Sequence, residues 1–257
     1  MDIGNFSDLQ ILITGGSDGI GLGLASRFAK AGATVLVTGR NREKLQMAAQ
    51  SHPGIRILIN DIGYVDERER LAQHVRDTLP GLNAVINNAG IQRRISLADD
   101  DAPWSERQRE IEILLSAPVH LNHLLIPMIL ANGKPAFIAN VTSGGAYIPQ
   151  PFAPIYSACK AALHSYTVNL RFSLANTTCK VFEIIPPAVR TALAGSNATH
   201  GEPLDDFCDA VFAAMASGAQ EEIGYGMTAS PAVQERLNAE KQMFAVLSER
   251  FPVKTYF

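Results

Sequence analysis

The segment LQILITGGSDGIGLGLASRFAKAG, residues 9–32, joins an apolar run to a glycine-rich turn and then to an amphipathic pattern. Residues 9–14 have the continuous apolar character of a buried strand, and residues 19–31 have the periodicity of a helix. Glycine allows a tight turn and a close approach to the backbone, and free N–H groups at a helix start attract negative charge. A strand, turn and helix in this order predict a site for a diphosphate group.

The same alternation of apolar runs and amphipathic segments continues along the chain. Strands buried on both faces by crossover helices are typical of parallel sheets. We therefore predict an α/β fold: a single doubly wound Rossmann-type domain with a central parallel sheet of about seven strands and helices on both faces. The further strands are expected at 34–39, 55–60, 83–88, 135–141 and 180–185, and the further helices at 41–51, 64–79, 103–131, 154–176, 204–217 and 229–250.

Composition limits the classes of partner. The chain has 257 residues, of which 47% are hydrophobic and 18% charged, and no Pro/Gly/Ser-rich linker divides it, so one domain spanning 1–257 is expected. A net charge of −3 without a Lys/Arg run predicts no nucleic-acid or membrane-surface partner. Three scattered cysteines and no targeting segment favour a cytoplasmic protein. The apolar stretch 111–130 contains histidines, an asparagine and prolines, so we interpret it as a buried helix rather than a membrane span.

Four motifs follow one another in an order that is more specific than any one of them. They are TGGSDGIG at 14–21, NNAG at 87–90, a serine at 143, and a tyrosine and a lysine four residues apart at 156 and 160. Over about residues 9–191 this order resembles the short-chain dehydrogenase/reductase family. Within that family, GIQRRI (90–95), EIIPPAVRT (183–191) and EEIGYG (221–226) resemble the D-alanine-transfer (DltE-like) oxidoreductases.

The resemblance implies an enzyme that uses a nicotinamide dinucleotide to interconvert a carbonyl and an alcohol on a small-molecule substrate. It implies a cofactor-binding half at about 1–140 and a catalytic and substrate half at about 141–257. It also implies a homodimer or homotetramer built from the helices that contain Leu114 and Tyr156. The implied cofactor-binding residues are Gly15, Ser17, Asp18, Gly19, Ile20, Gly21, Arg40, Asp61, Ile62, Asn88, Tyr156, Lys160, Val189 and Thr191.

The residues after the second strand bear on the choice of cofactor. NAD is usually held there by an acid on the ribose 2′-hydroxyl, whereas the 2′-phosphate of NADP needs a cation. Here Gly39 stands at the acid's position and Arg40 follows, so NADP(H) is favoured over NAD(H). The alternative is that Arg40 or Arg42 is only a solvated residue at a helix start. Asp18 argues the other way, because NADP-dependent family members often have a basic residue near that position.

Two further matches to the family have structural alternatives. By resemblance, Asp61 contacts the adenine ring with Ile62 beside it, but it could instead cap the next helix, as could Asp66. Asn88 corresponds to the asparagine that lines the cofactor, but NNAG could be only a turn with capping side chains.

The catalytic prediction depends on proton transfer. A carbonyl that accepts hydride also needs a proton, and a free tyrosine, with a pKa of about 10, exchanges its proton poorly at neutral pH. An ammonium group at i+4 shares the helix face and lowers that pKa, so Lys160 can activate Tyr156. By resemblance Tyr156 is the acid/base, Lys160 also binds the nicotinamide ribose, and Ser143 orients the substrate. Ser143 could otherwise be only a turn residue, and Thr142 is a neighbouring competitor for its role.

One expected residue is absent. In the family an asparagine distorts the helix after NNAG and holds a water for the proton relay, and here Leu114 aligns with it. Ser116 is the nearest polar substitute, and Asn122 lies about two turns further along the helix. Leucine can neither donate nor accept a hydrogen bond. The alternative function is therefore a dinucleotide-binding protein with weak or no catalysis, acting as a sensor or structural subunit.

The remaining candidates each have a structural interpretation. We expect no metal site, and we interpret His120, His123 and His164 as core or interface residues and Cys159 as a packing residue. Arg93 and Arg94 could reach the mouth of a pocket and favour an acidic substrate, or be ordinary loop residues. The irregular segment 186–206 is a candidate substrate-covering lid, whose Leu193, Asn197 and His200 suggest no particular ligand.

Overall fold

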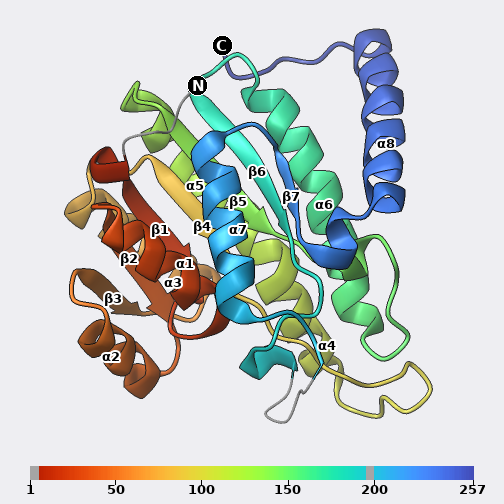
Figure 1. Cartoon of the computed structure of the whole chain (residues 1–257), viewed down its shortest axis with the longest axis horizontal. Helices are drawn as coiled ribbons and strands as arrows, with labels where there is room; N and C mark the ends of the chain where they lie inside the picture. Colours follow the sequence, from red (N-terminus) through yellow and green to blue (C-terminus); the bar gives the residue numbers. More distant parts are fainter. Residues whose placement is uncertain (1–5, 195–199) are drawn as a thin grey trace.

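A seven-stranded parallel sheet forms the centre of the molecule (Figure 1). The structure is a computed structural model that describes residues 6–194 and 200–257. The strand order is β3-β2-β1-β4-β5-β6-β7, which confirms the predicted doubly wound parallel sheet. The strands are β1 (Gln10–Thr14), β2 (Thr34–Gly39), β3 (Ile55–Ile59), β4 (Ala84–Asn87), β5 (Ala136–Val141), β6 (Cys179–Ile185) and β7 (Glu222–Gly224).

The strand order reverses at β1. Ile11 of β1 pairs with Val35 of β2 on one side and with Ala84 of β4 on the other. The chain thus runs outward from β1 to β2 and β3 and then crosses back to β4 on the opposite side of β1. In an open α/β sheet this reversal leaves a crevice outside the carboxyl ends of the strands, where ligands bind. The fold therefore places the glycine-rich turn after β1 at the expected binding edge.

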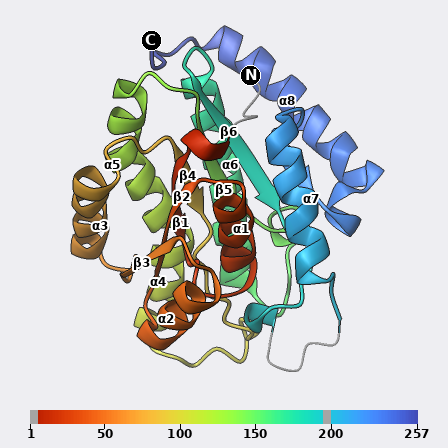
Figure 2. The same cartoon turned by 60° about the vertical axis from the view of Figure 1, so that its left-hand side comes forward.

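Helices cover both faces of the sheet, and Figure 2 shows α3 and α5 opposite α1 and α7. One core layer includes Phe28, Leu45 and Phe207, from α1 (Gly19–Lys30), α2 (Arg42–Ser51) and α7 (Leu204–Ser217). The other includes Leu71, Leu121 and Leu170. These come from α3 (Val65–Thr78), α5 (Ala117–Ala131) and α6 (Pro154–Leu174), while α8 (Pro231–Arg250) lies beside α6.

The element boundaries agree with the predicted ranges to within one or two residues, with two differences. Strand β7 has only three residues and was not among the apolar runs. The predicted helix at 103–131 is α4 (Trp104–Ile111) and α5 joined by a π-helical segment, η2 (Glu112–Ser116). Short 3-10 turns are η1 (Phe6–Asp8), η3 (Gly144–Ala146), η4 (Ala192–Ala194) and η5 (Gly226–Ala229).

The joined helix Trp104–Ala131 is, within the described residues, the one helix long and apolar enough to cross a membrane by length and composition. Half of its most apolar window is buried inside the molecule. Leu121, Leu125 and Ile129 pack in the core layer that also contains Leu71 of α3. The helix is therefore a core helix of this fold, in agreement with the interpretation of the sequence.

Gly15 lets the turn after β1 press against the chain after β4. Its φ of +66° lies in the left-handed region, and a Cβ there would lie 2.7 Å from the Cα of Ala89. Because that neighbour is backbone, it cannot rotate away as a side chain could. Two separate constraints, conformation and contact, therefore require glycine at this position.

Gly133 offers a matched comparison for these two constraints. Its φ is +59°, but a Cβ there would meet nothing within 4 Å. We expect Gly133→Ala to cost about 1 kcal/mol of unfolding free energy from conformation alone, and Gly15→Ala at least about twice that because of the added clash. Urea unfolding of both variants measures the difference, and equal losses would show that the contact with Ala89 contributes nothing.

Candidate active site

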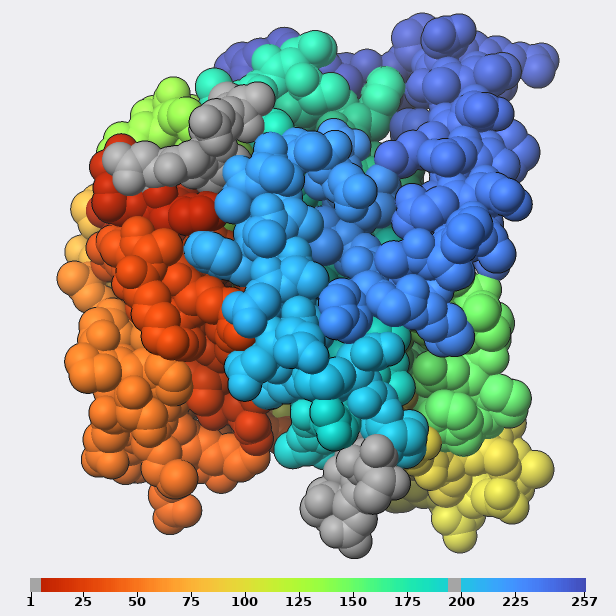
Figure 3. All heavy atoms as spheres, in the orientation of Figure 1, coloured from red at the N-terminus to blue at the C-terminus, as the bar shows by residue number. Residues whose placement is uncertain are grey.

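A cavity of about 970 Å³ opens at the carboxyl ends of the strands. Its lining comes from the turn after β1, the ends of β2, β4 and β5, helix α6 and the segment after β6. Figure 3 shows the surface notched between the red N-terminal segment and the teal segment that contains η4. The structure brings to this lining the predicted residues Gly15, Ser17, Asp18, Gly19, Ile20, Arg40, Asp61, Ile62, Asn88, Ser143, Tyr156, Lys160, Val189 and Thr191.

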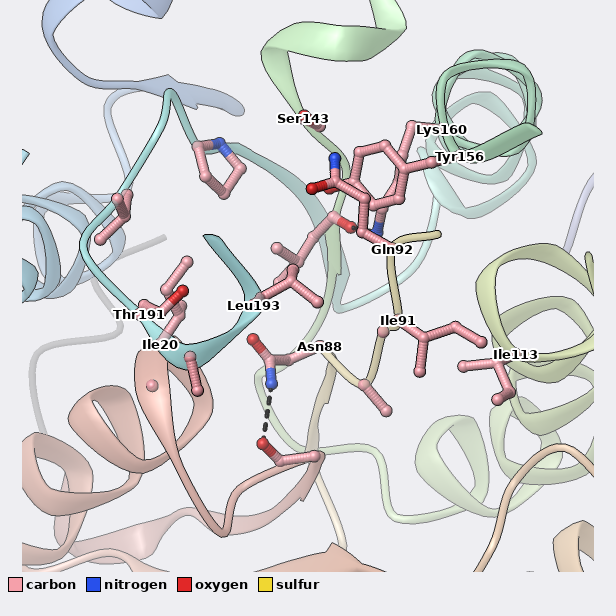
Figure 4. A pocket seen from close by; sticks show the side chains of 18 of the residues that line it. Ile20, Asn88, Ile91, Gln92, Ile113, Ser143, Tyr156, Lys160, Thr191 and Leu193 are labelled. Atoms are coloured by element: carbon pink, nitrogen blue, oxygen red, sulfur yellow. Dashed lines mark hydrogen bonds between the residues drawn. The ribbon is translucent and has the colours of Figure 1, made fainter. Parts of the chain in front are cut away.

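Gly21 is the one predicted site residue that does not line the cavity. A Cβ on Gly21 would lie 2.4 Å from both Nδ2 of Asn88 and the carbonyl oxygen of Gly15. The Asn88 amide fills that space and donates to the carbonyl oxygens of Thr14 at 3.0 Å and Gly15 at 3.1 Å (Figure 4). The NNAG segment thus fixes the shape of the glycine-rich turn.

Asp18 caps α1 and is neutralised by a neighbour. Its carboxylate accepts the Gly19 N–H at 2.7 Å and pairs with Nζ of Lys44 at 2.6 Å. The hydrogen bond from Lys44 holds the pKa of Asp18 below its ordinary value. Arg40 lines the same end of the cavity, and no carboxylate pairs with it among the described residues. The local charge is therefore suited to an anion despite Asp18.

These features form a cradle of the shape that a dinucleotide requires. The turn is built from glycines whose missing Cβ atoms leave room for close neighbours, such as the Ala89 backbone beside Gly15 and the Asn88 amide beside Gly21. The amino end of α1 faces the cavity, and Arg40 adds a cation beyond the end of β2. The residues present therefore fit a nicotinamide dinucleotide.

Asp61 follows β3, the strand beside β2, and lines the cavity on the same side as Arg40. Its carboxylate accepts the Gly63 N–H at 3.1 Å and pairs with the guanidinium of Arg109, which lies 4.6 Å from the ring centroid of Tyr64. Helix α3 begins after Tyr64 without a side-chain cap, so neither Asp61 nor Asp66 plays the capping role. Sequence reasoning missed Arg109, because its partner lies 48 residues away.

Ser143, Tyr156 and Lys160 converge in the cavity (Figure 4). Ser143 follows β5 and accepts the Gly145 N–H at 3.0 Å. Lys160 lies one helical turn after Tyr156, donates from Nζ to the carbonyl oxygen of Val141 at 2.6 Å, and places Nζ 5.6 Å from the Tyr156 ring centroid. Ser143 and Tyr156 line the same part of the cavity, close enough for the Ser143 hydroxyl to act on the pKa of the phenol.

The electrostatics of this group differ from the simple picture of an ammonium that lowers the pKa of tyrosine. Burial raises the pKa of Tyr156 and outweighs the opposite effect of the Ser143 hydrogen bond. Burial also lowers the pKa of Lys160 to about 8. Because the Lys160 ammonium is directed to the Val141 carbonyl, its effect on the phenol is small in this arrangement.

Glu110 is a buried carboxyl that sequence reasoning missed. It is 1% exposed and accepts the Arg93 N–H at 3.1 Å. Burial raises the pKa of Glu110 itself, and its charge adds to the raised pKa of Tyr156. Burial, followed by the Glu110 charge, raises the pKa of Cys159 to about 11, so this thiol stays protonated and packs.

Leu114 lies in the middle of the π-helical segment η2. It is 1% exposed and packs with Ala153, Tyr156 and Cys159. The helix is thus distorted at this position although the asparagine of the family is absent. The position next to Tyr156 is apolar, so a proton relay through a side chain at position 114 is excluded.

A chain of buried side chains connects the elements that carry the catalytic group. Asn87 at the end of β4 donates to Asn122 of α5 and to Asn140 of β5, each at 2.9 Å, and Asn140 donates to Thr167 of α6 at 2.9 Å. This amide chain fixes α5 and α6 against the ends of β4 and β5.

His164 joins a second buried network behind Ser143. Its ring nitrogens lie 2.8 Å from Glu183 and 2.9 Å from Glu240, and Glu183 also accepts the hydroxyls of Thr142 and Tyr147 at 2.7 and 2.8 Å. Burial alone lowers the pKa of His164, but the bonds to Glu183 and Glu240 outweigh it, so the pKa is raised. The network connects α8 to the residue before Ser143.

The other candidates are distributed as follows. His120 is half-buried and His123 exposed, and among residues 6–194 and 200–257 no group of three His, Cys, Asp or Glu side chains is arranged to hold a metal. Arg93 is bound by Asp100, whereas Arg94 lines the cavity.

The candidate lid is partly described. Its two ends are joined by a bridge between Val189 and Glu202, and Leu193 and His200 line the cavity. Asn197 lies outside the described residues.

Comparison with known proteins shows the family of this chain. The model of the short chain dehydrogenase family matches residues 10–201. The chain therefore belongs to the short-chain dehydrogenase/reductase family of NAD(P)-dependent oxidoreductases. It is DltE-like: the uncharacterized oxidoreductase DltE of Bacillus subtilis (strain 168) is 40% identical over 183 residues, which are 71% of this chain and 72% of that protein. An uncharacterized oxidoreductase of Staphylococcus aureus (strain USA300) is 31% identical over 81% of this chain and 91% of its own.

Solved structures share the fold. A short-chain dehydrogenase from Sphingobium yanoikuyae in complex with NADPH superposes with a TM-score of 0.82 at 22% identity, over 93% of this chain and 95% of its own. A short chain dehydrogenase from Burkholderia cenocepacia J2315 in complex with NADP gives 0.74 at 25% identity, over 95% and 97%. The 3-ketoacyl-(acyl-carrier-protein) reductase of Brucella melitensis complexed with NADH gives 0.76 at 25% identity, over 83% and 95%.

The raised pKa of His164 makes stability depend on pH. The contribution is complete below the pKa of an unfolded histidine, about 6.5, and is lost as the pH rises through the higher folded pKa. The unfolding free energy should therefore contain a component that falls with pH above about 6.5. Chemical unfolding at a series of pH values measures it.

His164→Gln should remove this component and cost about 3 kcal/mol at low pH, because Glu183 loses a charged partner in the interior. The exposed His123, changed to Gln, is the matched control and should leave the pH dependence intact. An unchanged slope in the His164→Gln protein would contradict the assignment.

Proposed function

We propose that this protein is an NADP(H)-dependent oxidoreductase that interconverts a carbonyl and an alcohol, with Tyr156 as the acid/base. The observation that carries the proposal is that Ser143, Tyr156 and Lys160 line the same cavity as the glycine-rich turn, with Nζ of Lys160 5.6 Å from the Tyr156 ring centroid. A group that donates a proton and a group that orients an oxygen thus share one space with a cradle for a dinucleotide.

The proposed chemistry gives each residue a distinct task. A bound nicotinamide dinucleotide supplies hydride to a carbonyl carbon, or accepts it from an alcohol. In reduction, Ser143 holds the substrate oxygen, and the Tyr156 phenol gives that oxygen its proton as the C–O π electrons move onto it. The burial that raises the pKa of Tyr156 keeps it protonated and ready to donate. Lys160, whose pKa is lowered to about 8, can return a proton near neutral pH.

Arg40 supports the choice of NADP(H) over NAD(H). It lines the cavity next to Gly39, where no acid is available to bind a ribose 2′-hydroxyl, and Lys44 compensates Asp18 nearby. A guanidinium matches a phosphate in charge and in geometry. Structures in complex with NADP and with NADH both share this fold, so the fold does not distinguish the two cofactors. The proposed preference for NADP(H) therefore rests on Arg40.

A second candidate is a dinucleotide-binding protein with little turnover. The observation that favours it is Leu114, which places an apolar side chain against Tyr156. In that case the cavity would bind the cofactor tightly without reaction.

We propose one domain, acting in the cytoplasm on a small molecule, with nucleic acid and membrane surfaces excluded as partners by the absence of a basic run. We propose a homodimer or homotetramer through α6 and the helix that contains Leu114, since α6 exposes the small residues Ala158 and Ala161 along its outer side.

Replacement of Tyr156 tests the catalytic assignment. Tyr156→Phe removes the proton donor and keeps the ring, so turnover on a panel of carbonyl compounds with NADPH should fall at least about 100-fold. NADPH affinity, measured by fluorescence titration, should stay within about threefold of the wild type.

Tyr256→Phe is the matched control, because Tyr256 does not line the cavity, and it should turn over like the wild type. Retained activity in Tyr156→Phe would refute the acid/base role. Tight NADPH binding by the wild type with no turnover across the panel would favour the second candidate function.

Replacement of Arg40 tests the cofactor preference. Arg40→Gln removes one charged hydrogen-bond donor, so the Kd for NADPH should rise about tenfold while that for NADH changes little. Arg42→Gln removes the same charge two residues away, outside the cavity lining, and should affect neither. Equal effects of Arg40→Gln on both cofactors would contradict recognition of the 2′-phosphate.

A further inference from the structure

Arg94 is a cationic side chain of the cavity for which the proposed chemistry has no use. Its neighbour Arg93 is bound by Asp100 through two hydrogen bonds of 2.8 and 2.7 Å. Arg94 instead lies 4.4 Å above the ring centroid of Phe152, and both residues line the cavity. In the part of the chain that the structure describes, no carboxylate pairs with Arg94. Nη1 donates to Gln92, and the Nε and Nη2 edge makes no hydrogen bond among the described residues, so it can donate two parallel ones.

Polar side chains connect Arg94 to the catalytic serine. Arg94 donates to the Gln92 side chain at 3.3 Å, and Gln92 donates to Gln150 at 3.2 Å. A Cβ atom placed on Gly145 would lie 3.3 Å from the amide carbon of Gln150 and 3.4 Å from the hydroxyl oxygen of Ser143. The Gln150 and Ser143 side chains therefore lie on the same side of Gly145. Figure 4 shows Gln92 next to Ser143 and Tyr156. A row of polar groups thus leads from the proposed carbonyl position outward to Arg94.

Apolar side chains surround this row of polar groups. Ile148, Phe152, Leu193 and Met227 are large apolar side chains that line the same cavity and are 58%, 44%, 43% and 61% exposed. Exposed apolar side chains that gather at one cavity mark a surface that an apolar ligand covers. This part of the cavity therefore combines an apolar wall with the guanidinium of Arg94, with which no carboxylate pairs among the described residues.

We propose that Arg94 is a specificity-determining residue that binds the carboxylate of an apolar carbonyl or hydroxy acid. The inference rests on the proposed function and assigns the substrate class of the same cavity. The substrate places its carbonyl or hydroxyl oxygen at Ser143 and Tyr156, its hydrocarbon part against Phe152 and Leu193, and its carboxylate at Arg94. A carboxylate carries one charge, which one guanidinium balances, whereas a phosphate monoester dianion calls for more than one cation.

The binding test uses probes that cannot be reduced or oxidised at a carbonyl. Octanoate and octanamide have the same shape and differ in charge, and calorimetry with the full chain in the presence of NADP⁺ compares their affinities. Octanoate should bind about tenfold more tightly than octanamide, and Arg94→Gln should abolish that ratio. Arg94→Lys keeps the charge without the planar fork and should retain part of the ratio. Arg76→Gln, on the exposed face of α3, removes the same charge and should leave the ratio unchanged.

Three outcomes would overturn the inference: no octanoate binding by the wild type, equal affinities for the two probes, or a ratio that survives Arg94→Gln. Tighter binding of octyl phosphate than of octanoate, lost in Arg94→Gln, would replace the carboxylate by a phosphate. Because no hydride is transferred, these results are independent of the turnover of the Tyr156→Phe protein. That turnover decides the proposed function separately.

Discussion

The site depends on the requirement that polar groups buried at the ends of parallel strands find partners in the interior. The chain from Asn122 through Asn87 and Asn140 to Thr167 gives each of these side chains at least one partner and ties β4, β5, α5 and α6 together, while Oδ1 of Asn87 and Nδ2 of Asn122 have no partner among the described residues. An unpaired buried amide is expensive, so the four elements have little freedom to shift independently. Since β5 precedes Ser143 and α6 carries Tyr156 and Lys160, the geometry of the proposed chemistry follows from these hydrogen bonds.

Local sequence signals were sufficient for the fold and for the residues of the cavity wall. Periodicity located six strands and the helices, and the order of motifs named the residues after β1, β4 and β5 that line the cavity. Strand β7 escaped because three residues are too few to show a pattern. The partners of Asp61 and of the Arg93 backbone escaped as well, because Arg109 and Glu110 carry no local mark of a pairing that only the tertiary structure creates.

The tyrosine and lysine show why spacing alone does not determine chemistry. Positions i and i+4 placed the two side chains on one helix face as predicted, but the desolvation of each depends on everything packed around it. Burial raises the pKa of Tyr156 and lowers that of Lys160 to about 8, so the difference between the two pKa values becomes larger than in the free side chains. The π-helical segment at Leu114 makes a similar point, because the helix keeps its distortion while the polar side chain is missing.

The three cysteines of the protein have low reactivity. Cys159, Cys179 and Cys208 are buried, and burial raises the pKa of their thiols to about 11, 12 and 11. Peroxides and disulfides react with thiolates, which are scarce at such pKa values and out of reach in the core. The three thiols are therefore poor targets for oxidation, in contrast to the exposed methionines Met47, Met227 and Met243.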